Sequence, residues 1–215
     1  MPELAIQVAG AEMVPFAVAP TIAFHLQIAN AARNETIHTV VLRCQIQIDV
    51  TRRTYAPAEQ ARLRDLFGQP DRWGQTLRSL LWTHASVVVP AFEGSRTSVD
   101  LHIPCTFDFN VASTKYFEGL ESGAIPLLML FSGTVFYASN DNPLQVSPIS
   151  WDLEARCVLP VQTWRDMMSH YYPNSAWINL HRDAFDRLHQ YKIDHGIPTW
   201  EQALERLLAE EMVRP

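Results

Sequence analysis

Alternating apolar and polar residues mark the clearest strand of the chain, Ile37–Val50. Its apolar positions are Val40, Leu42, Cys44, Ile46, Ile48 and Val50. The residues between them are mostly polar, and β-branched side chains are frequent. This pattern is typical of a strand with one face on a core and the other in water. Because one strand cannot bury its own apolar face, we expect neighbouring strands and a second layer.

Shorter or weaker alternation predicts further strands at Leu4–Val8, Thr21–Asn30, Trp82–Pro90, Ser98–Phe109, Leu144–Ile149 and Arg156–Val161. A polar loop leads from Thr21–Asn30 into Ile37–Val50, so we expect these two strands to pair antiparallel as a hairpin with a rather long loop. Pro104 takes an outward position in its strand and cannot donate to a hydrogen-bond ladder. We therefore expect this strand to lie at a sheet edge or to be bulged at Pro104.

The segment Ile125–Ala138 is apolar almost throughout, without alternation. Such a run predicts a strand that is covered on both faces, one of them by something outside the sandwich. Gly133 in its middle indicates a bulge or a close approach of another backbone.

Helical spacing replaces alternation in the rest of the chain. A short helix is expected from Pro57 to the stop at Gly68, and another over NVASTKYFEGLESG. From Pro160 onward the segments VQTWRDMMSHYY, HRDAFDRLHQYKIDHG and WEQALERLLAEE predict helices. In the last of these the residues expected to face inward are Ala203, Leu204, Leu207 and Leu208.

Together these elements predict a single α+β domain over residues 1–215. It contains a largely antiparallel, β-sandwich-like sheet with short helical insertions and a C-terminal helical lobe. Residues 1–159 are mainly the sandwich-like part, with an insertion over 55–80, and residues 160–215 form the helical lobe packed on it. We expect this lobe to cover the second apolar face of Ile125–Ala138.

The charge balance narrows the range of partners. A formal net charge of −6 argues against nucleic acid or an anionic membrane as the main partner. The N-terminal segment lacks the basic and apolar regions of a signal peptide, and the most apolar run is far shorter than a membrane span. We therefore expect a cytoplasmic protein. Three widely spaced cysteines fit neither a disulfide framework nor a cysteine-based metal site.

Motifs that would identify an enzyme are missing from the sequence. It contains no Walker A sequence, GxGxxG, nucleophile elbow or HExxH pair. We therefore assign no catalytic residue, metal site or cofactor, and the sequence favours a non-catalytic role.

Histidines give one alternative. His25 and His102 both take outward positions on predicted strands, and Asp186 and His189 form an i,i+3 pair on a predicted helix. Such groups could bind a metal, and a metal-handling protein or an enzyme using these histidines stays open as an alternative function. Solvated surface histidines explain the same pattern.

Arginines and tryptophans gather in the insertion and beside it. Arg52, Arg53, Trp73, Arg78 and Trp82 are our candidate contacts for a protein partner, because such long excursions from a sheet often carry function. A solvated helix face explains the arginines equally well, because acidic residues alternate with them.

Aromatic residues gather in the predicted lobe. Trp164, Tyr171 and Trp177 could line an apolar ligand pocket between the sheet and the helical lobe, which would make the protein a small-ligand-binding sandwich. Core packing is the other explanation for this group.

Several longer segments match a known family. They are LRCQIQI with TRR, FGQPDRWGQTLRSLLWTH, VVVPAF, PCTFDFNVASTKYF, LMLFSGTVFY, PNSAW and PTW. On these segments the chain resembles an uncharacterised, mainly actinobacterial family of about this length, encoded in [NiFe]-hydrogenase gene clusters. The resemblance extends from about Pro2 to Leu208.

This resemblance implies an accessory role in assembly, maturation or subunit handling, with a hydrogenase subunit as the protein partner. It brings no catalytic residues, because the family has no established activity. We therefore expect a non-catalytic accessory protein that acts by protein–protein binding.

Overall fold

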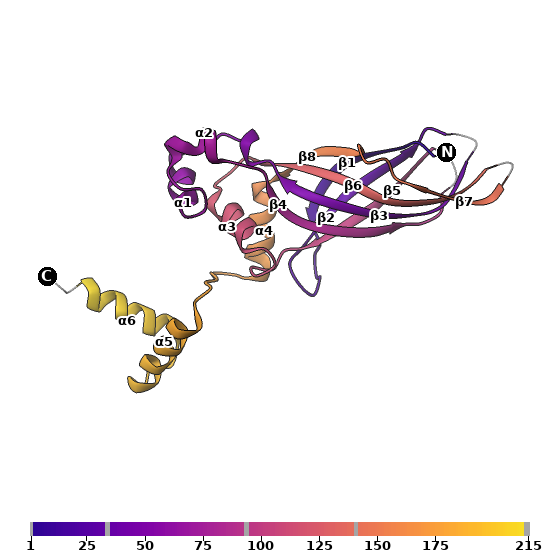
Figure 1. The fold of residues 1–215 in the computed structure, drawn as a ribbon. Helices are drawn as coiled ribbons and strands as arrows, with labels where there is room; N and C mark the ends of the chain where they lie inside the picture. The colour runs from indigo at the N-terminus through magenta and orange to yellow at the C-terminus, as the bar shows by residue number, and fades with distance from the viewer. Residues whose placement is uncertain (1, 33–34, 93–94, 140–141, 213–215) are drawn as a thin grey trace. The chain divides into compact units, whose positions relative to one another are not determined.

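The computed structural model describes residues 2–32, 35–92, 95–139 and 142–212. The chain divides into two compact units, residues 1–174 and residues 175–215. The first unit holds antiparallel sheets and helices, and the second is helical (Figure 1). The predicted α+β class with antiparallel sheets is confirmed.

One sheet has the strand order β1-β2-β5. Its strands are β1 (Leu4–Met13), β2 (Thr21–Asn30) and β5 (Arg96–Pro104). β2 is central and pairs antiparallel with both neighbours. β5 therefore lies at an edge of this sheet and ends at Pro104, as the position of that proline predicted.

The second sheet has the order β4-β3-β6-β7, and β8 also pairs with β6. Its strands are β3 (Thr36–Ile48), β4 (Leu80–Val89), β6 (Ala124–Ser139), β7 (Asn142–Pro148) and β8 (Glu154–Pro160). β8 pairs with the first half of β6 and β7 with its second half, while β3 runs along the other side of β6.

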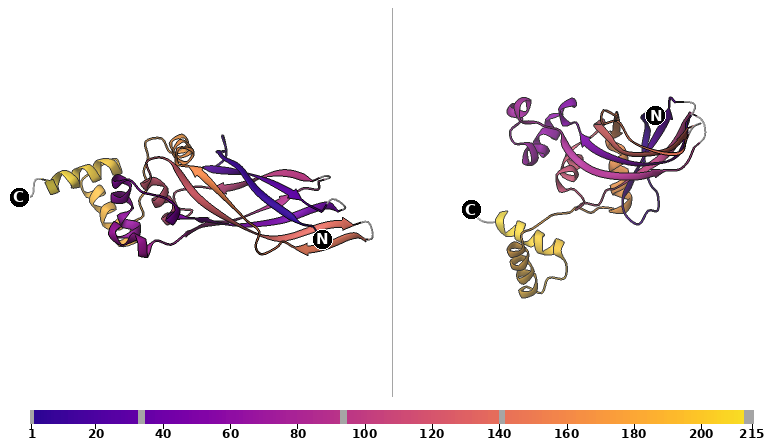
Figure 2. Two further views of the ribbon diagram at one scale, coloured as in Figure 1. Left: turned by 90° about the horizontal axis from the view of Figure 1, so that it is seen from above. Right: turned by 45° about the vertical axis from the view of Figure 1, so that its right-hand side comes forward.

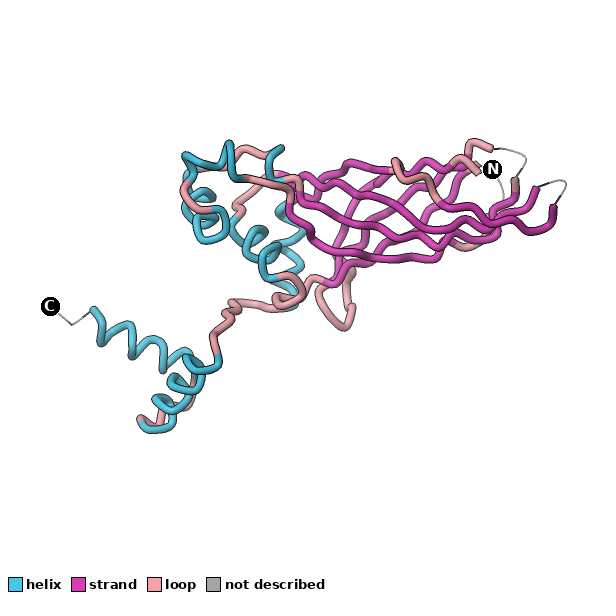
Figure 3. The backbone as a smooth tube through the Cα atoms, in the orientation of Figure 1, coloured by secondary structure: helices cyan, strands magenta, loops and turns pink. Residues whose placement is uncertain are grey.

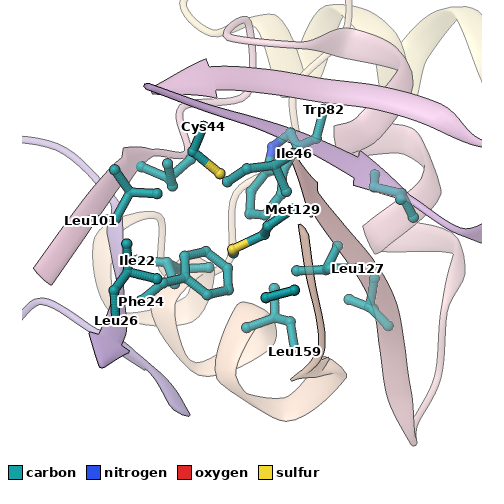
Figure 4. Close-up of a cluster of buried hydrophobic side chains, with 14 of the residues drawn as sticks. Ile22, Phe24, Leu26, Cys44, Ile46, Trp82, Leu101, Leu127, Met129 and Leu159 are labelled. Carbon is teal, nitrogen blue, oxygen red and sulfur yellow. The ribbon is translucent and has the colours of Figure 1, made fainter. Parts of the chain in front are cut away.

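The core lies between the inner faces of the two sheets (Figure 4). The inward residues of β3 are all buried: Val40, Leu42, Cys44, Ile46 and Ile48. They share one hydrophobic cluster with inward residues of β2, among them Phe24 and Leu26, and with Leu101 of β5. The alternation along Ile37–Val50 thus predicted the buried face correctly.

The expected hairpin of Thr21–Asn30 with Ile37–Val50 is wrong. β2 pairs with β1 and β5, whereas β3 pairs with β4 and β6, so the two strands belong to different sheets. Both present an apolar face to the same core, and alternation alone cannot tell a partner within a sheet from a partner across the core.

β6 confirms the close backbone approach expected at Gly133. Gly133 has φ +137° and lies opposite Leu42 of β3. A Cβ atom at this position would stand only 2.0 Å from the carbonyl oxygen of Val41, so only glycine fits here. The inward residues of β6 are buried, and Leu128 and Leu130 on its other face are half-buried.

The helices of the first unit gather at one end of its sheets (Figures 1 and 2). They are α1 (Pro57–Phe67), α2 (Trp73–Thr76), α3 (Val111–Gly119) and α4 (Val161–Tyr171), with 3₁₀ turns η1 (Val50–Arg52) and η2 (Pro70–Arg72). α1 packs on α3, where a Cβ at Gly119 would come within 2.6 Å of Leu63. α4 contacts α3, β1 and β8.

The second unit consists of α5 (Arg182–Asp194) and α6 (Trp200–Met212). α5 ends before Gly196, which has φ +60°, and the hydroxyl of Thr199 accepts the N–H of Gln202 at the start of α6. The helical lobe expected from residue 160 is thus divided, because α4 belongs to the first unit. The packing of this lobe on the sheets stays a prediction. Among the described residues no helix is long and apolar enough to cross a membrane.

Candidate functional site

The two tryptophans expected at a partner surface lie inside the first unit. Trp73 and Trp82 are only 6% and 3% exposed. The indole N–H of Trp73 donates to the carbonyl of Gly68 over 3.1 Å. Trp82 packs edge-to-face on Phe24 and Phe117, with ring centroids 6.1 Å and 5.1 Å apart. Both indoles belong to the buried hydrophobic core of this unit. A partner-binding role for Trp73 and Trp82 stays a prediction, and their burial gives it no support.

Arg53 is likewise internal, with a side chain that is 10% exposed. Its guanidinium donates to the carbonyls of Ser122 and Ala124 over 2.5 Å and 2.6 Å. It also donates to the carboxylate of Glu59 over 2.7 Å. Arg53 therefore ties the chain just before the insertion to Ser122 and to Ala124, the first residue of β6. A partner-binding role for Arg53 stays a prediction.

Glu59 completes this connection from α1. Its carboxylate accepts the backbone N–H groups of Ala56 and Glu121 over 3.1 Å and 2.9 Å, besides the bond from Arg53. Burial raises the pKa of the Glu59 carboxyl, but the two N–H donors and the Arg53 charge outweigh it, so the pKa is lowered overall. The carboxylate is charged in the folded protein at neutral pH.

Arg52 and Arg78 remain on the surface. Arg78 donates to the nearby carbonyls of Gln75 and Leu77. Arg52 borders a hollow of about 450 Å³ lined by Asp49, Arg52, Pro126, Leu127, Arg156, Cys157 and Val158. The guanidinium of Arg156 in this hollow already lies 3.5 Å from the carboxylate of Asp49 and 3.6 Å from that of Glu154. A partner-binding role for Arg52 and Arg78 stays a prediction.

The three residues expected to line a ligand pocket have separate roles. Trp164 is buried and its ring lies 4.6 Å from that of Phe117. The hydroxyl of Tyr171 lies near a loop of the first unit, and Trp177 belongs to the second unit. Trp164 is thus a packing residue, and ligand binding by this group stays a prediction.

His25 sits between two carboxylates on the outer face of the β1-β2-β5 sheet. Its Nδ1 lies 2.7 Å from Asp100 of β5, and its Nε2 lies 3.4 Å from Glu12 of β1. The hydrogen bond to Asp100 raises the pKa of His25, against a lowering by burial, and the charges of Asp100 and Glu12 raise it further. Protonated His25 therefore crosslinks three strands.

The other metal candidates do not assemble. His102 pairs in register with Ala23 rather than with His25. Asp186 accepts a bond from Arg182, and His189 stacks on Phe185. Among the residues that the structure describes, no group of three His, Cys, Asp or Glu side chains could hold a metal ion.

The three cysteines are free thiols. Cys44 and Cys105 are buried, and Cys157 is half-buried. Burial raises the pKa of each thiol to about 12. None of them therefore has the lowered pKa of a catalytic or redox-active cysteine.

A loop that the sequence analysis did not single out carries two strongly exposed apolar residues of the first unit. Between β1 and β2, Phe16 is 92% exposed and Val18 is fully exposed. The signal that could have revealed this loop is the apolar run MVPFAVAP, which contains two prolines and so cannot continue either strand.

The second unit exposes the apolar side of its helices. Phe185 of α5 lies 5.5 Å from Trp200 of α6, ring centroid to centroid. Only Ala203 is buried among the residues whose burial is described in this unit. Of the four α6 residues expected to face inward, Leu204, Leu207 and Leu208 are exposed.

Comparison with known proteins adds little about activity. No curated protein matches the chain. A solution structure described as a late embryogenesis abundant (LEA) protein has a TM-score of 0.34 and 10% identity, over 74% of this chain and 72% of that one. A crystal structure described as ApaA from Bordetella pertussis has a TM-score of 0.27 and 12% identity, over 74% and 93%. Likeness at this level assigns no function.

A family match covers the whole sequence. The family described as "Family of unknown function (DUF6084)" matches residues 1–215. This chain therefore belongs to the DUF6084 family.

Proposed function

We propose that this chain is a non-catalytic accessory protein that acts by binding another protein during assembly or maturation of a [NiFe]-hydrogenase. The partner is a hydrogenase subunit or its precursor, and the binding takes place in the cytoplasm. The link to hydrogenase is supported by the resemblance of segments such as LRCQIQI and LMLFSGTVFY. The mode of action, protein binding, is supported by the second unit.

The observation that carries this proposal is the exposed apolar side of α5 and α6. Phe185, Trp200, Leu204 and Leu208 are exposed, and little of the unit is buried. Helices of about this length gain most of their stability from packing an amphipathic face. A helical pair with so little buried surface needs further apolar surface to cover it. Helix-in-groove contact with a protein is one well-known way to provide that surface.

The charge of the chain favours a protein over other macromolecules. The net charge of −6 would repel the phosphates of nucleic acids and of anionic lipids. An apolar helix face bordered by both acidic and basic side chains, such as Asp186 and Arg187, suits a protein groove with a mixed polar rim.

The test is an affinity purification of the tagged full-length chain from its native host. Mass spectrometry would identify bound proteins, and metal analysis would be made on the same eluate. We expect a hydrogenase subunit to be enriched without stoichiometric metal on the tagged chain. The double variant Leu204→Glu/Leu208→Glu should lose this enrichment, because it places charges on the apolar face of α6.

Leu144→Glu is the control, because the exposure of Leu144 on β7, 59%, lies between that of Leu204 (38%) and that of Leu208 (67%). It should retain the partner. Enrichment of no hydrogenase subunit would refute the hydrogenase link. Equal capture by the double variant would refute the role of the second unit, and stoichiometric metal would favour a metal-handling function instead.

A further inference from the structure

The loop between β1 and β2 presents apolar side chains that the fold does not use. It protrudes from the sheets of the first unit (Figure 3). Phe16 is 92% exposed and Val18 is fully exposed at its tip. Exposed apolar side chains of this size stay in water only at a cost, and a cluster of them commonly marks an interaction site.

The backbone at Phe16 adds a second cost. Phe16 has φ +59° and directly follows Pro15. Glycine and asparagine adopt this left-handed conformation readily, whereas a bulky aromatic residue there is uncommon and strained. Folding alone would favour a small or polar residue at such an exposed and strained position. Phe16 is therefore explained by binding rather than by stability.

The loop is also held in place from several sides. The hydroxyl of Tyr171 on α4 lies 3.1 Å from the carbonyl oxygens of both Val14 and Ala17 and shares its proton between them. Val14 N–H donates to Thr21 across the base of the loop, and Cys105 N–H donates to Pro20. A loop fixed in this way loses little conformational entropy when it binds.

The surroundings decide what kind of surface could accept the loop. Residues 13–24 contain no charged side chain, and residues 1–32 contain no Lys or Arg. The nearest aromatic neighbour is His170 of α4, whose ring centroid is 6.4 Å from that of Phe16. An anionic lipid surface rewards basic residues, and this loop offers none. A convex pair of apolar side chains fits instead a small apolar pocket on a protein.

We propose that Phe16 and Val18 form an anchor that inserts into an apolar pocket on the protein partner. This inference rests on the proposed function, because it specifies a second contact with the same partner. The anchor is pre-organised by Tyr171 and by the prolines at both ends of the loop. Phe16 supplies most of the buried area, because aromatic side chains dominate such contacts.

The first experiment locates the partner of the loop. The photoreactive analogue p-benzoyl-phenylalanine would replace Phe16 in the full-length chain, and irradiation would be carried out in the native host. Trp151 is the matched control position, because it is an aromatic residue with 93% exposure on a different loop. We expect position 16, but not position 151, to crosslink to one protein, and the crosslinked peptide to line an apolar pocket.

The second experiment measures affinity with that purified partner. Phe16→Asn should weaken binding by about 10- to 100-fold, the loss usual for an aromatic anchor. Its unfolding temperature should stay equal to the wild type or rise, because asparagine tolerates the positive φ. Trp151→Asn should bind as the wild type does.

Several outcomes would overturn the anchor. One is that Phe16→Asn binds the partner as tightly as the wild type. Another is that Phe16→Asn and Trp151→Asn lose the same amount of affinity. A third is that position 16 crosslinks only to lipid, only to a second copy of this chain, or to nothing. The anchor and the proposed function fail separately. A crosslinked partner that is not a hydrogenase subunit refutes the hydrogenase link alone, whereas a hydrogenase subunit that binds Phe16→Asn normally refutes the anchor alone.

Discussion

The guanidinium of Arg53 lies 2.7 Å from the carboxylate of Glu59, and the two side chains are only 10% and 4% exposed. Together they join α1 to the start of β6, because Arg53 also donates to Ser122 and to Ala124, the first residue of that strand. An ion pair buried in this way has each charge solvated by the other and by backbone groups. Replacing Arg53 or Glu59 by a neutral residue leaves the charge of the other side chain buried and unpaired.

Glu59→Gln should therefore destabilise the protein by about 3–5 kcal/mol, since it leaves the Arg53 charge buried and unpaired. Urea unfolding at pH 7 measures this loss. Glu121→Gln is the control, because Glu121 pairs with Arg62 at the surface, with both side chains about half exposed. That variant should differ from the wild type by less than about 1 kcal/mol. Equal losses in the two variants would contradict the role given to Arg53 and Glu59.

The same pair makes stability depend on pH in the acid range. The pKa of Glu59 is lower in the folded chain than in the unfolded chain, so the carboxylate stabilises the fold above its ordinary pKa. This contribution is lost as the pH falls through the folded-state pKa. The difference in the free energy of unfolding between wild type and Glu59→Gln should hence shrink as the pH is lowered below about 5. Urea unfolding of both proteins at a series of acid pH values would measure this difference.

His25 should give the opposite dependence near neutral pH. Its pKa is raised mainly by the hydrogen bond to Asp100, so its contribution is present below the ordinary histidine pKa and disappears as the pH rises through the folded-state value. Asp100→Asn should lower the pKa of His25, as followed by NMR titration of the imidazole. A His25 pKa that does not move in this variant would show that Asp100 is not the cause.

Gly133 is the most sensitive single position that the backbone reveals. Gly133→Ala would place a Cβ 2.0 Å from the carbonyl oxygen of Val41, at φ +137°. We expect the free energy of unfolding to fall by more than about 4 kcal/mol. Urea unfolding would measure this loss, and failure to obtain soluble protein would be its extreme form. Gly74→Ala in α2 is the control, because no atom lies within 4 Å of its added Cβ. It should be neutral or stabilise by up to about 1 kcal/mol.

Tyr171→Phe should loosen the loop that carries Phe16 without unfolding the protein. The variant loses one hydroxyl hydrogen bond, worth about 1 kcal/mol, and keeps the aromatic ring. NMR relaxation should show increased motion of the Ala17 and Val18 amides relative to the wild type. Unchanged relaxation would mean that the prolines alone hold the loop.

The buried faces of single strands could be predicted from the sequence, because alternation reports which side of a strand faces a core. The inward residues from Val40 to Ile48 illustrate this. The close backbone approach at Gly133 could also be predicted, because a glycine within an apolar strand indicates one. The assignment of strands to sheets could not be predicted. β2 and β3 carry equally strong apolar faces, and only the three-dimensional packing places them across the core from each other.

The candidate site was harder to predict for a related reason. Trp73 lies in a segment rich in charges and Trp82 follows soon after it, so their neighbours in sequence suggested a surface. In space, Trp73 packs on Tyr55 and Phe67 of the same insertion. Trp82 packs on Phe117, which comes from α3. In the sequence Arg53 and Glu59 likewise resemble solvated charges. In the fold they are buried, and they bond to backbone groups of Glu121, Ser122 and Ala124, which lie far away in the sequence. Phe16 shows the reverse case, an apolar residue left outside.

Alkylation of the three buried or half-buried thiols would report the order in which parts of the fold open. With pKa values of about 12, they offer almost no thiolate to an alkylating reagent at neutral pH while the chain stays closed. Cys105 follows β5, Cys44 lies within β3 and Cys157 within β8, so each reports on a different layer or edge. The order in which the three become labelled would therefore show which part of the sandwich opens first, with no residue replaced.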